Sequence, residues 1–274
     1  MKKRPAVTVV LLLCIVLMVP AAYPVFKMTR QYDGIYIANR EAVMEAIRKG
    51  LKNRSEKLVL HFTAYTKDME AAQTQTEELF RQALSESEDP AGGDYIRYQL
   101  GGYELHGNAQ RRFLTWHYTM EVSPAYYTSR EEEAYVDAEV ERLLAQSPRE
   151  ASQEVRIRWV HDLVTGMLSY DRVHKNRPQS HGKTTAYAAL RYHQAVCQGY
   201  AVLTYRLLKE LGIGCRIVTG EAVVEGKAER HAWLMVTTEE GARYLDPTLD
   251  DVFECDEWYL KTAEEFSRDH EPEE

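Results

Sequence analysis

The sequence has few cysteines and none of the residue spacings that common metal and nucleotide sites use. Only 4 cysteines occur in 274 residues, which excludes a disulfide-rich scaffold. No HExxH or CxxC motif is present, and Gly182-Lys183-Thr184 is not a P-loop because Arg177 stands where its first glycine belongs. We therefore predict no bound metal and no nucleotide or other cofactor.

Positive charge is also scarce. Lys and Arg number 34 against 42 Asp and Glu, giving a formal net charge of −8 at pH 7. A groove that binds nucleic acid by neutralising phosphates needs the opposite balance, so we predict no nucleic-acid partner. With 45% hydrophobic and 28% charged residues, the chain can bury a sizeable core as one large domain or two small ones.

The chain has one long uncharged run, from residue 6 to residue 26, behind Lys2, Lys3 and Arg4. We interpret residues 1–26 as a signal peptide or, because the run is close to the ~20 residues that span a bilayer, as an uncleaved membrane anchor. Leu13 is too bulky for the cleavage site of a lipoprotein, so we do not expect lipidation at Cys14. Either interpretation predicts an extracytoplasmic protein, secreted or anchored at the cell surface.

Residues 27–127 are predicted to form a small α+β unit. Helices are expected after Asn39 and Asp68, and strands at 58–62, 95–100 and 113–122, with turns at Gly101, Gly102, Gly107 and Asn108. The histidines of this unit are scattered singly and indicate no reactive site; they are His61, His106 and His117.

Residues 128–274 are predicted to form a second domain that begins with a linker helix. Ser129 and Glu132 make a capping box for that helix, and Ser152 is the expected cap of the next. In the second of these helices, a four-residue repeat predicts a buried stripe made of Val155, Trp159, Leu163 and Met167, widened by Val160 and Val164.

Cys197 stands at the predicted start of an apolar helix that ends near Gly212. The N–H groups and the dipole at a helix N-terminus stabilise a thiolate and can supply donors for an oxyanion. The alternative is that Cys197 is a small buried hydrophobic residue, the commonest fate of a free cysteine.

Two further residues are predicted to approach each other on neighbouring strands. His231 lies on one strand, and a reversal near Glu239 returns the chain so that Asp246 lies either directly opposite it or displaced by two residues on the same face. Cysteine, histidine and aspartate are the parts of a thiol acyl-transfer site. Trp233 shares the face of His231 and could wall the cleft or be a core tryptophan.

These segments resemble the bacterial transglutaminase-like superfamily. The resemblance rests on ordered blocks with supporting Tyr170-Asp171, Tyr259–Lys261 and Glu264–His270 elements; the blocks are Ala186–Leu190, Ala195–Ala201, His231–Trp233 and Tyr244–Thr248. It implies a papain-like α+β core in which a nucleophile helix packs on an antiparallel sheet. Cys197, His231 and Asp246 match the family triad, and no calcium site of the animal enzymes can be traced.

The resemblance also implies attack on a carboxamide or peptide carbonyl, a thioester, and transfer of the acyl group to an amine or water. Gln194 and Tyr187 are candidates for the oxyanion donor by position only. The sequence thus predicts an exported enzyme acting on a protein or peptide, including a cell-wall-associated one, with membrane contact if residues 1–26 are retained.

The alternative is a non-catalytic cell-surface binding or assembly module on the same fold. A further possibility is a disulfide between Cys215 and Cys255 in an oxidising exterior. The acidic residues Glu271, Glu273 and Glu274 are interpreted as a solvated end of the domain.

Overall fold

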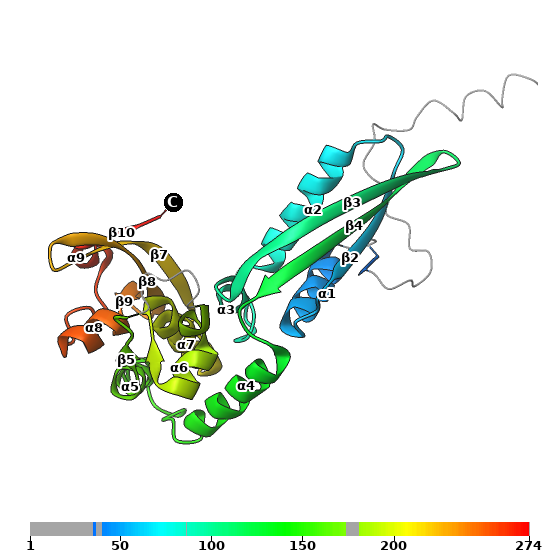
Figure 1. Cartoon of the computed structure of the whole chain (residues 1–274). Helices are drawn as coiled ribbons and strands as arrows, with labels where there is room; N and C mark the ends of the chain where they lie inside the picture. Colours follow the sequence, from blue (N-terminus) through cyan, green and yellow to red (C-terminus); the bar gives the residue numbers. More distant parts are fainter. Residues whose placement is uncertain (1–34, 37–39, 86, 174–180, 274) are drawn as a thin grey trace, which may run out of the picture.

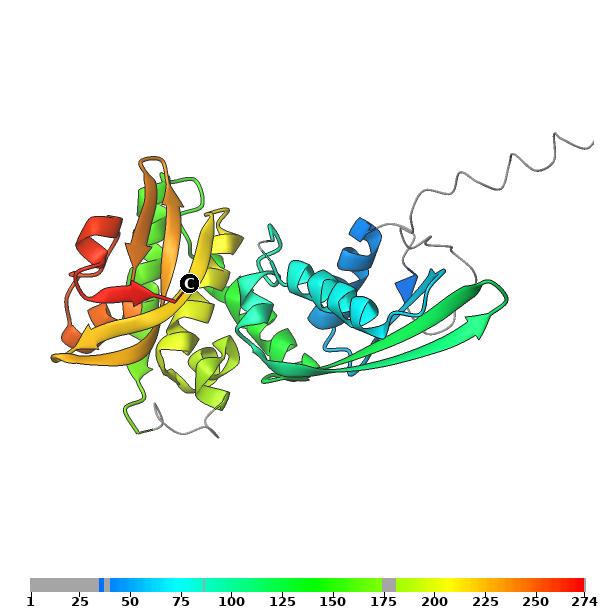
Figure 2. The same cartoon turned by 90° about the horizontal axis from the view of Figure 1, so that it is seen from above.

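The computed structural model describes residues 35–36, 40–85, 87–173 and 181–273. Two lobes lie side by side and are joined through helix α4, Arg130–Leu144 (Figures 1 and 2). The predicted signal or anchor segment, residues 1–26, and the helix cap at Asn39 lie outside the described residues. Within the described ranges, no helix combines the length and the apolar character that a membrane span requires.

The first lobe is a four-stranded sheet in the order β1-β2-β4-β3, with β1 parallel to β2 and the other pairs antiparallel. Val43, Ile47 and Leu51 are completely buried, as their four-residue spacing predicts. The elements of this lobe are β1 (Ile35–Tyr36), α1 (Arg40–Lys52), β2 (Leu58–Ala64), α2 (Met69–Ala83), α3 (Asp94–Arg97), β3 (Leu100–Arg112) and β4 (Thr115–Tyr126). The predicted cap of α2 is confirmed, since Asp68 Oδ1 accepts a hydrogen bond from the Ala71 N–H at 2.9 Å.

Two predictions in this lobe are wrong. In place of the strand expected at 95–100, residues 95–97 belong to the short helix α3, in which Tyr95 and Ile96 are both buried, and residues 98–99 form a turn before β3. The turns expected at Gly101–Asn108 are instead part of the 13-residue strand β3. Strand β3 lies at the sheet edge and exposes most of its side chains, so glycine and polar residues are tolerated there.

The second lobe contains an antiparallel sheet in the order β10-β7-β8-β9, against which α7 packs. Its elements are α5 (Gln153–Met167), β5 (Ser169–Tyr170), η1 (His181–Thr184), α6 (Ala186–Tyr192), β6 (Gln194–Ala195), α7 (Cys197–Glu210), β7 (Cys215–Val224), β8 (Lys227–Thr238), β9 (Gly241–Leu245), α8 (Pro247–Phe253), α9 (Ala263–Phe266) and β10 (His270–Pro272). Every residue of α7 from Gly199 to Lys209 is buried. The predicted α+β class, with this helix on an antiparallel sheet, is confirmed.

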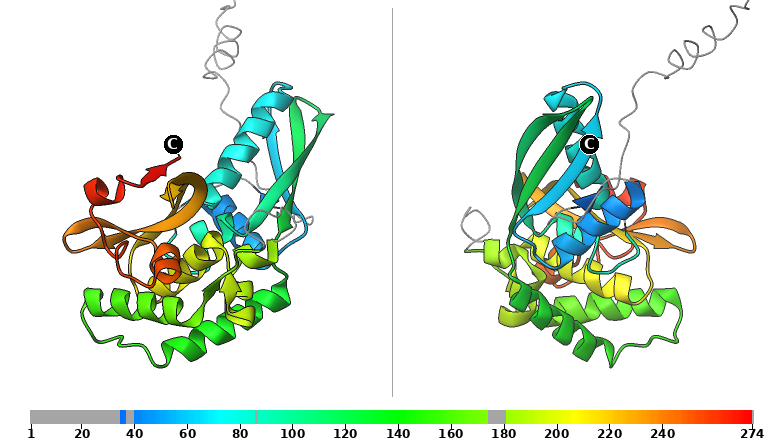
Figure 3. Two further views of the ribbon diagram at one scale, coloured as in Figure 1. Left: turned by 60° about the vertical axis from the view of Figure 1, so that its left-hand side comes forward. Right: turned by 90° about the vertical axis from the view of Figure 1, so that its right-hand side faces the viewer.

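Helices α4 (Arg130–Leu144) and α5 run along the base of the molecule in Figure 3. The capping box of α4 is confirmed, with Ser129 and Glu132 bonding to each other's backbone N–H. The buried face of α5 is rotated from the predicted stripe, because Val155 is 48% exposed. The buried residues of this helix are Ile157, Val160, His161 and Val164. The prediction is right for Val160 and Val164 and wrong for Val155, and it left out the apolar Ile157 and the polar His161, both of which belong to the buried face.

The predicted disulfide between Cys215 and Cys255 does not form. The Cys215 thiol is buried and donates to the Tyr205 carbonyl oxygen, and the Cys255 thiol contacts Asp250 Oδ1, each at 3.8 Å. Glu271 and Glu273 are exposed, as predicted for a solvated end, although the backbone of His270–Pro272 pairs as β10 on the edge of the second sheet; Glu274 lies outside the described residues.

A buried ion pair connects the two lobes. The Asp94 carboxylate is fully buried and accepts hydrogen bonds from Arg216 Nε at 2.6 Å, Arg216 Nη2 at 3.0 Å and the Ile217 N–H at 3.0 Å. Nearby, the Gln198 side chain donates to the Tyr98 carbonyl oxygen. The first lobe therefore contacts the residue that directly follows Cys197.

We predict that Asp94→Ala destabilises the protein by about 2–4 kcal/mol, because it leaves a partly buried guanidinium and a buried N–H without their acceptor. Urea unfolding would measure the change. The matched control is Glu121→Ala, which removes an exposed pair with Lys57 and should cost less than about 1 kcal/mol. Equal losses in the two variants would contradict a special role for the Asp94 pair.

Candidate active site

Cys197 is the first residue of α7, as predicted, and its side chain is partly exposed. The residue at position 199 must be small for this helix start to pack. A Cβ at Gly199 would lie 2.7 Å from both the Lys183 carbonyl oxygen and the Ala195 Cβ. The helix N-terminus is thus pressed against η1 and β6, with Cys197 at its open end.

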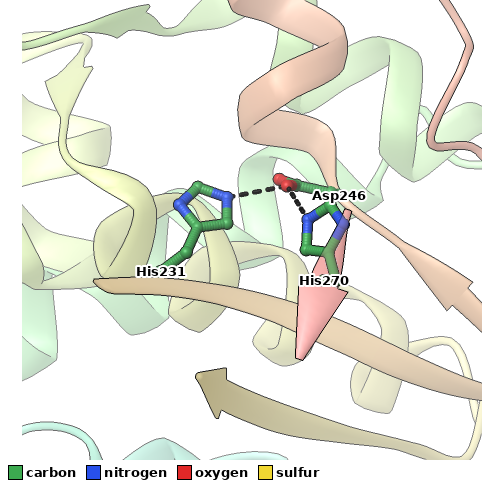
Figure 4. A group of neighbouring side chains, drawn as sticks. All are labelled: His231, Asp246 and His270. Atoms are coloured by element: carbon green, nitrogen blue, oxygen red, sulfur yellow. Dashed lines mark hydrogen bonds and ion pairs between the residues drawn. The ribbon is translucent and has the colours of Figure 1, made fainter. Parts of the chain in front are cut away.

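His231 and Asp246 are brought together by the second of the two predicted registers. Leu234 pairs with Leu245, and the turn lies between Thr238 and Gly241, so Asp246 is displaced by two residues from the position opposite His231. The His231 Nε2–H donates to Asp246 Oδ2 at 2.7 Å (Figure 4). His231 is 8% exposed and Asp246 is fully buried.

The Asp246 carboxylate accepts hydrogen bonds on both of its oxygens. Oδ1 accepts from the backbone N–H groups of Thr248 and Leu249, at 3.0 and 3.2 Å, and so caps the start of α8. Oδ2 accepts from His231 and also from His270 Nε2, at 3.2 Å. These four bonds fix the orientation of the carboxylate.

The electrostatics of the site favour a protonated imidazole on His231. Burial by itself disfavours the charged ring, but the charges of Asp246 and Cys197 and the hydrogen bond to Asp246 outweigh it, and they raise the pKa of His231 well above its usual value. The same imidazole, together with His270, overcomes the effect of burial on Asp246 and lowers the pKa of that carboxyl. Because Nε2 of His231 is bonded to Asp246, Nδ1 is the ring nitrogen left for Cys197.

A pocket of about 300 Å³ adjoins His231. It is lined by the β7–β8 hairpin, by α8 and by the segment at the end of β5. The charged lining residues are Arg172, Glu225, Lys227, Glu229 and Arg230. Tyr170 also lines it, and burial followed by the charge of Cys197 raises the pKa of Tyr170. Its hydroxyl is therefore a protonated donor within electrostatic reach of Cys197.

The three predicted accessory residues do not lie together in the structure. Trp233 is 1% exposed and packs beside the His231 ring, so it lies in the core and does not line the pocket. Gln194 is exposed, and its Oε1 accepts from Lys183 Nζ at 3.3 Å. The Tyr187 ring packs edge-on against Tyr135 of α4. The oxyanion roles of Gln194 and Tyr187 remain predictions.

His270 joins the site although the sequence analysis assigned it no role. It reaches Asp246 through β10, which returns to the far edge of the sheet beside β7. No hairpin links His270 to Asp246, so strand pairing read from the sequence could not place it there. The only available signal was its position in the tail element of the family resemblance.

Among the residues that the structure describes, two groups of side chains carry atoms that could bind a metal ion. One is His231, Asp246 and His270; the other is His161, Asp250 and Asp256. In both groups the histidine nitrogens already donate to a carboxylate, as His161 Nε2 does to Asp250 Oδ2 at 3.0 Å. A metal would have to replace these hydrogen bonds.

Residues 142–247 match the sequence profile of the Transglutaminase-like superfamily, which spans Cys197, His231 and Asp246. No curated protein matches the sequence.

Three solved structures are similar in part. A TGase has 17% identity and a TM-score of 0.39, with 77% of this chain and 58% of that chain covered. A candidate cysteine protease from Cytophaga hutchinsonii has 12% identity and a TM-score of 0.35 over 54% and 65% of the two chains. Menin, in a structure that reveals its binding site for Mixed Lineage Leukemia protein, has 16% identity and a TM-score of 0.31 over 77% and 36%. The chain thus spans less than two thirds of each of these neighbours.

We predict that Cys197→Ala lowers the pH at which His231 loses its proton by about one unit, because the variant removes a negative charge that stabilises the imidazolium. An NMR titration of the His231 ring would measure the shift. Cys255→Ala is the control and should leave the titration unchanged. An unchanged midpoint in Cys197→Ala would show that the thiol and the imidazole do not interact.

Proposed function

Residues 142–247 belong to the transglutaminase-like superfamily, and on this basis we propose that the chain is a cysteine enzyme that performs acyl transfer or hydrolysis on carboxamide or peptide bonds. The observation that carries the proposal is the buried His231–Asp246 pair, whose imidazole is also within electrostatic reach of Cys197. In this assignment Cys197 is the nucleophile, His231 the acid and base, and Asp246 the group that orients His231.

The chemistry proceeds in two halves. The Cys197 thiolate attacks the carbonyl carbon and forms the S–C bond, and the C–N bond then breaks as the His231 imidazolium gives its proton to the leaving amine or ammonia. In the second half, water or an amine attacks the thioester, His231 takes its proton, and the C–S bond breaks to restore the thiolate. Asp246 supports both halves because it holds Nε2 and directs Nδ1 toward Cys197.

Stabilisation of the tetrahedral oxyanion is assigned to the N-terminal end of α7 and to a side-chain donor. Tyr170 is a stronger candidate for that donor than Gln194 or Tyr187, because it lines the same pocket as His231 and its hydroxyl stays protonated. The acidic and basic side chains of the pocket suit a polar protein or peptide substrate.

The cellular setting is part of the proposal. Residues 1–26, with their basic start and uncharged run, support export to the cell surface by cleavage or by anchoring. We expect the substrate to be a protein or peptide of the cell surface or wall.

The test is the rate of iodoacetamide labelling at Cys197 from pH 4 to pH 9, followed by mass spectrometry. Because Asp246 raises the pKa of His231, the imidazolium should persist through neutral pH and sustain a thiolate in acid, so labelling should remain fast below about pH 6. His231→Ala should abolish this acid reactivity. His106→Ala, at an exposed histidine of β3, is the matched control.

An ordinary thiol profile with a midpoint near ~8.5, unchanged by His231→Ala, would overturn the proposal and favour the non-catalytic binding module. If the reactive profile is found, screens with amine donors and with peptides separate cross-linking from hydrolysis. Cys197→Ser should then abolish both labelling and turnover.

A further inference from the structure

His270 is held between two carboxylates inside the second lobe. Its Nε2 lies 3.2 Å from Asp246 Oδ2, and its Nδ1 lies 2.6 Å from Asp269 Oδ1. The residue is 3% exposed. Its ring stacks on Phe266 with centroids 3.9 Å apart and meets Trp233 edge-on at 4.9 Å. Both ring nitrogens are therefore fixed in place and directed at carboxylate oxygens.

An ionised carboxylate can only accept hydrogen bonds, whereas a neutral imidazole carries a single N–H. Asp246 is ionised, since its pKa is lowered by the two histidines. The other oxygen of Asp269, Oδ2, accepts a hydrogen bond from Trp258 Nε1 at 3.0 Å. Both contacts of His270 are satisfied only if both of its nitrogens carry protons.

The fold places His270 here through a close approach of two strands. Residues 270–272 pair with residues 222–220 of β7, and a Cβ at Gly220 would overlap the Glu271 carbonyl oxygen. The Val223 N–H also bonds to the Asp269 carbonyl oxygen, at 2.7 Å. The backbone on both sides of His270 is thus anchored to β7.

We propose that His270 is a doubly protonated positioning residue that completes a chain of alternating charges formed by Cys197, His231, Asp246, His270 and Asp269. In this chain, the positive charge of His270 offsets part of the negative charge that Asp246 exerts on His231. The His231 and His270 ring centroids are 5.9 Å apart, so the two cations share one carboxylate oxygen at close range (Figure 4).

The charge balance matters because His231 must both hold and release a proton. Without a second cation on Asp246, His231 would bind its proton more tightly and donate it less readily to a leaving amine. The titratable groups that face His270 are Asp246, Asp269 and His231, and its neighbours on α9 and β7, Phe266 and Ala222, are apolar. This role rests on the proposed function, whereas the charge of His270 does not.

The charge is tested by NMR of the full chain labelled with ¹⁵N-histidine, at pH 7. Long-range ¹H–¹⁵N spectra distinguish a ring with two N–H groups from a neutral ring. We expect both nitrogens of His270 to carry protons. One unprotonated nitrogen on His270 would overturn the inference, as would displacement of the N–H protons of His231 and His270 by added Zn²⁺ in the micromolar range, which would indicate a metal site.

The effect on His231 is tested by titrating its ring in His270→Gln and Asp269→Asn. His270→Gln removes the positive charge beside Asp246, so the pH at which His231 loses its proton should rise by about one unit. Asp269→Asn removes a negative charge, so it should raise that pH only if His270 loses its second proton at the same time. Glu271→Gln is the matched control, because Glu271 is an exposed acid of the same strand that does not bond to His270, and it should cause no shift.

Asp269→Asn keeps the buried ring of His270 and decides the outcome if His270→Gln does not fold. The protonation of His270 is read in the same spectra. A His231 midpoint that fails to rise when His270 has become neutral, in Asp269→Asn or at high pH in the unaltered chain, would overturn the tuning role. Failure here is distinct from failure of the proposed function: fast acid labelling of Cys197 together with a neutral His270 would refute this inference and leave the cysteine chemistry intact.

Discussion

The carboxylate of Asp246 is charged and completely buried, and much of the second lobe is arranged around it. A buried charge is tolerated only when it is paired and hydrogen-bonded on all sides. Two N–H groups of α8 bond to one of its oxygens, and two imidazoles from β8 and β10 bond to the other. The end of β9, the start of α8 and both sheet histidines are therefore connected through one side chain, and the geometry of His231 depends on it.

Cys197, the proposed nucleophile, is held in place by a different constraint. Helix α7 is buried over nearly its whole length, so Cys197 cannot shift without disturbing the core of the lobe. At its start, Gly199 allows contact with η1, and Gln198 bonds to the first lobe through the Tyr98 carbonyl oxygen. The Asp94–Arg216 pair also connects the two lobes. A buried helix thus packs against the sheet, and it carries Cys197 at its start while the sheet carries His231.

Local patterns predicted the features that depend on neighbours in sequence. The helix start at Cys197, the caps at Asp68 and Ser129, and one of the two offered registers between His231 and Asp246 are present in the structure. Features set by distant contacts were missed. Segment 95–97 is helical beside the buried Asp94, β3 keeps its extended form by pairing with β4, and His270 reaches its partners through a strand that follows no hairpin. None of these contacts leaves a periodic trace in the sequence.

The absence of a side chain at Gly220 has a consequence for how variants of this protein are interpreted. This glycine leaves the room through which β10 lies against β7, yet its own atoms contribute no acid, base or nucleophile to the site. Any larger residue would push away the strand that carries His270, and the disturbance would travel through Asp246 to His231. A mutational scan would then score this position as though its residue took part in the reaction. A sequence profile drawn from active proteins would retain glycine there only because β10 needs the space.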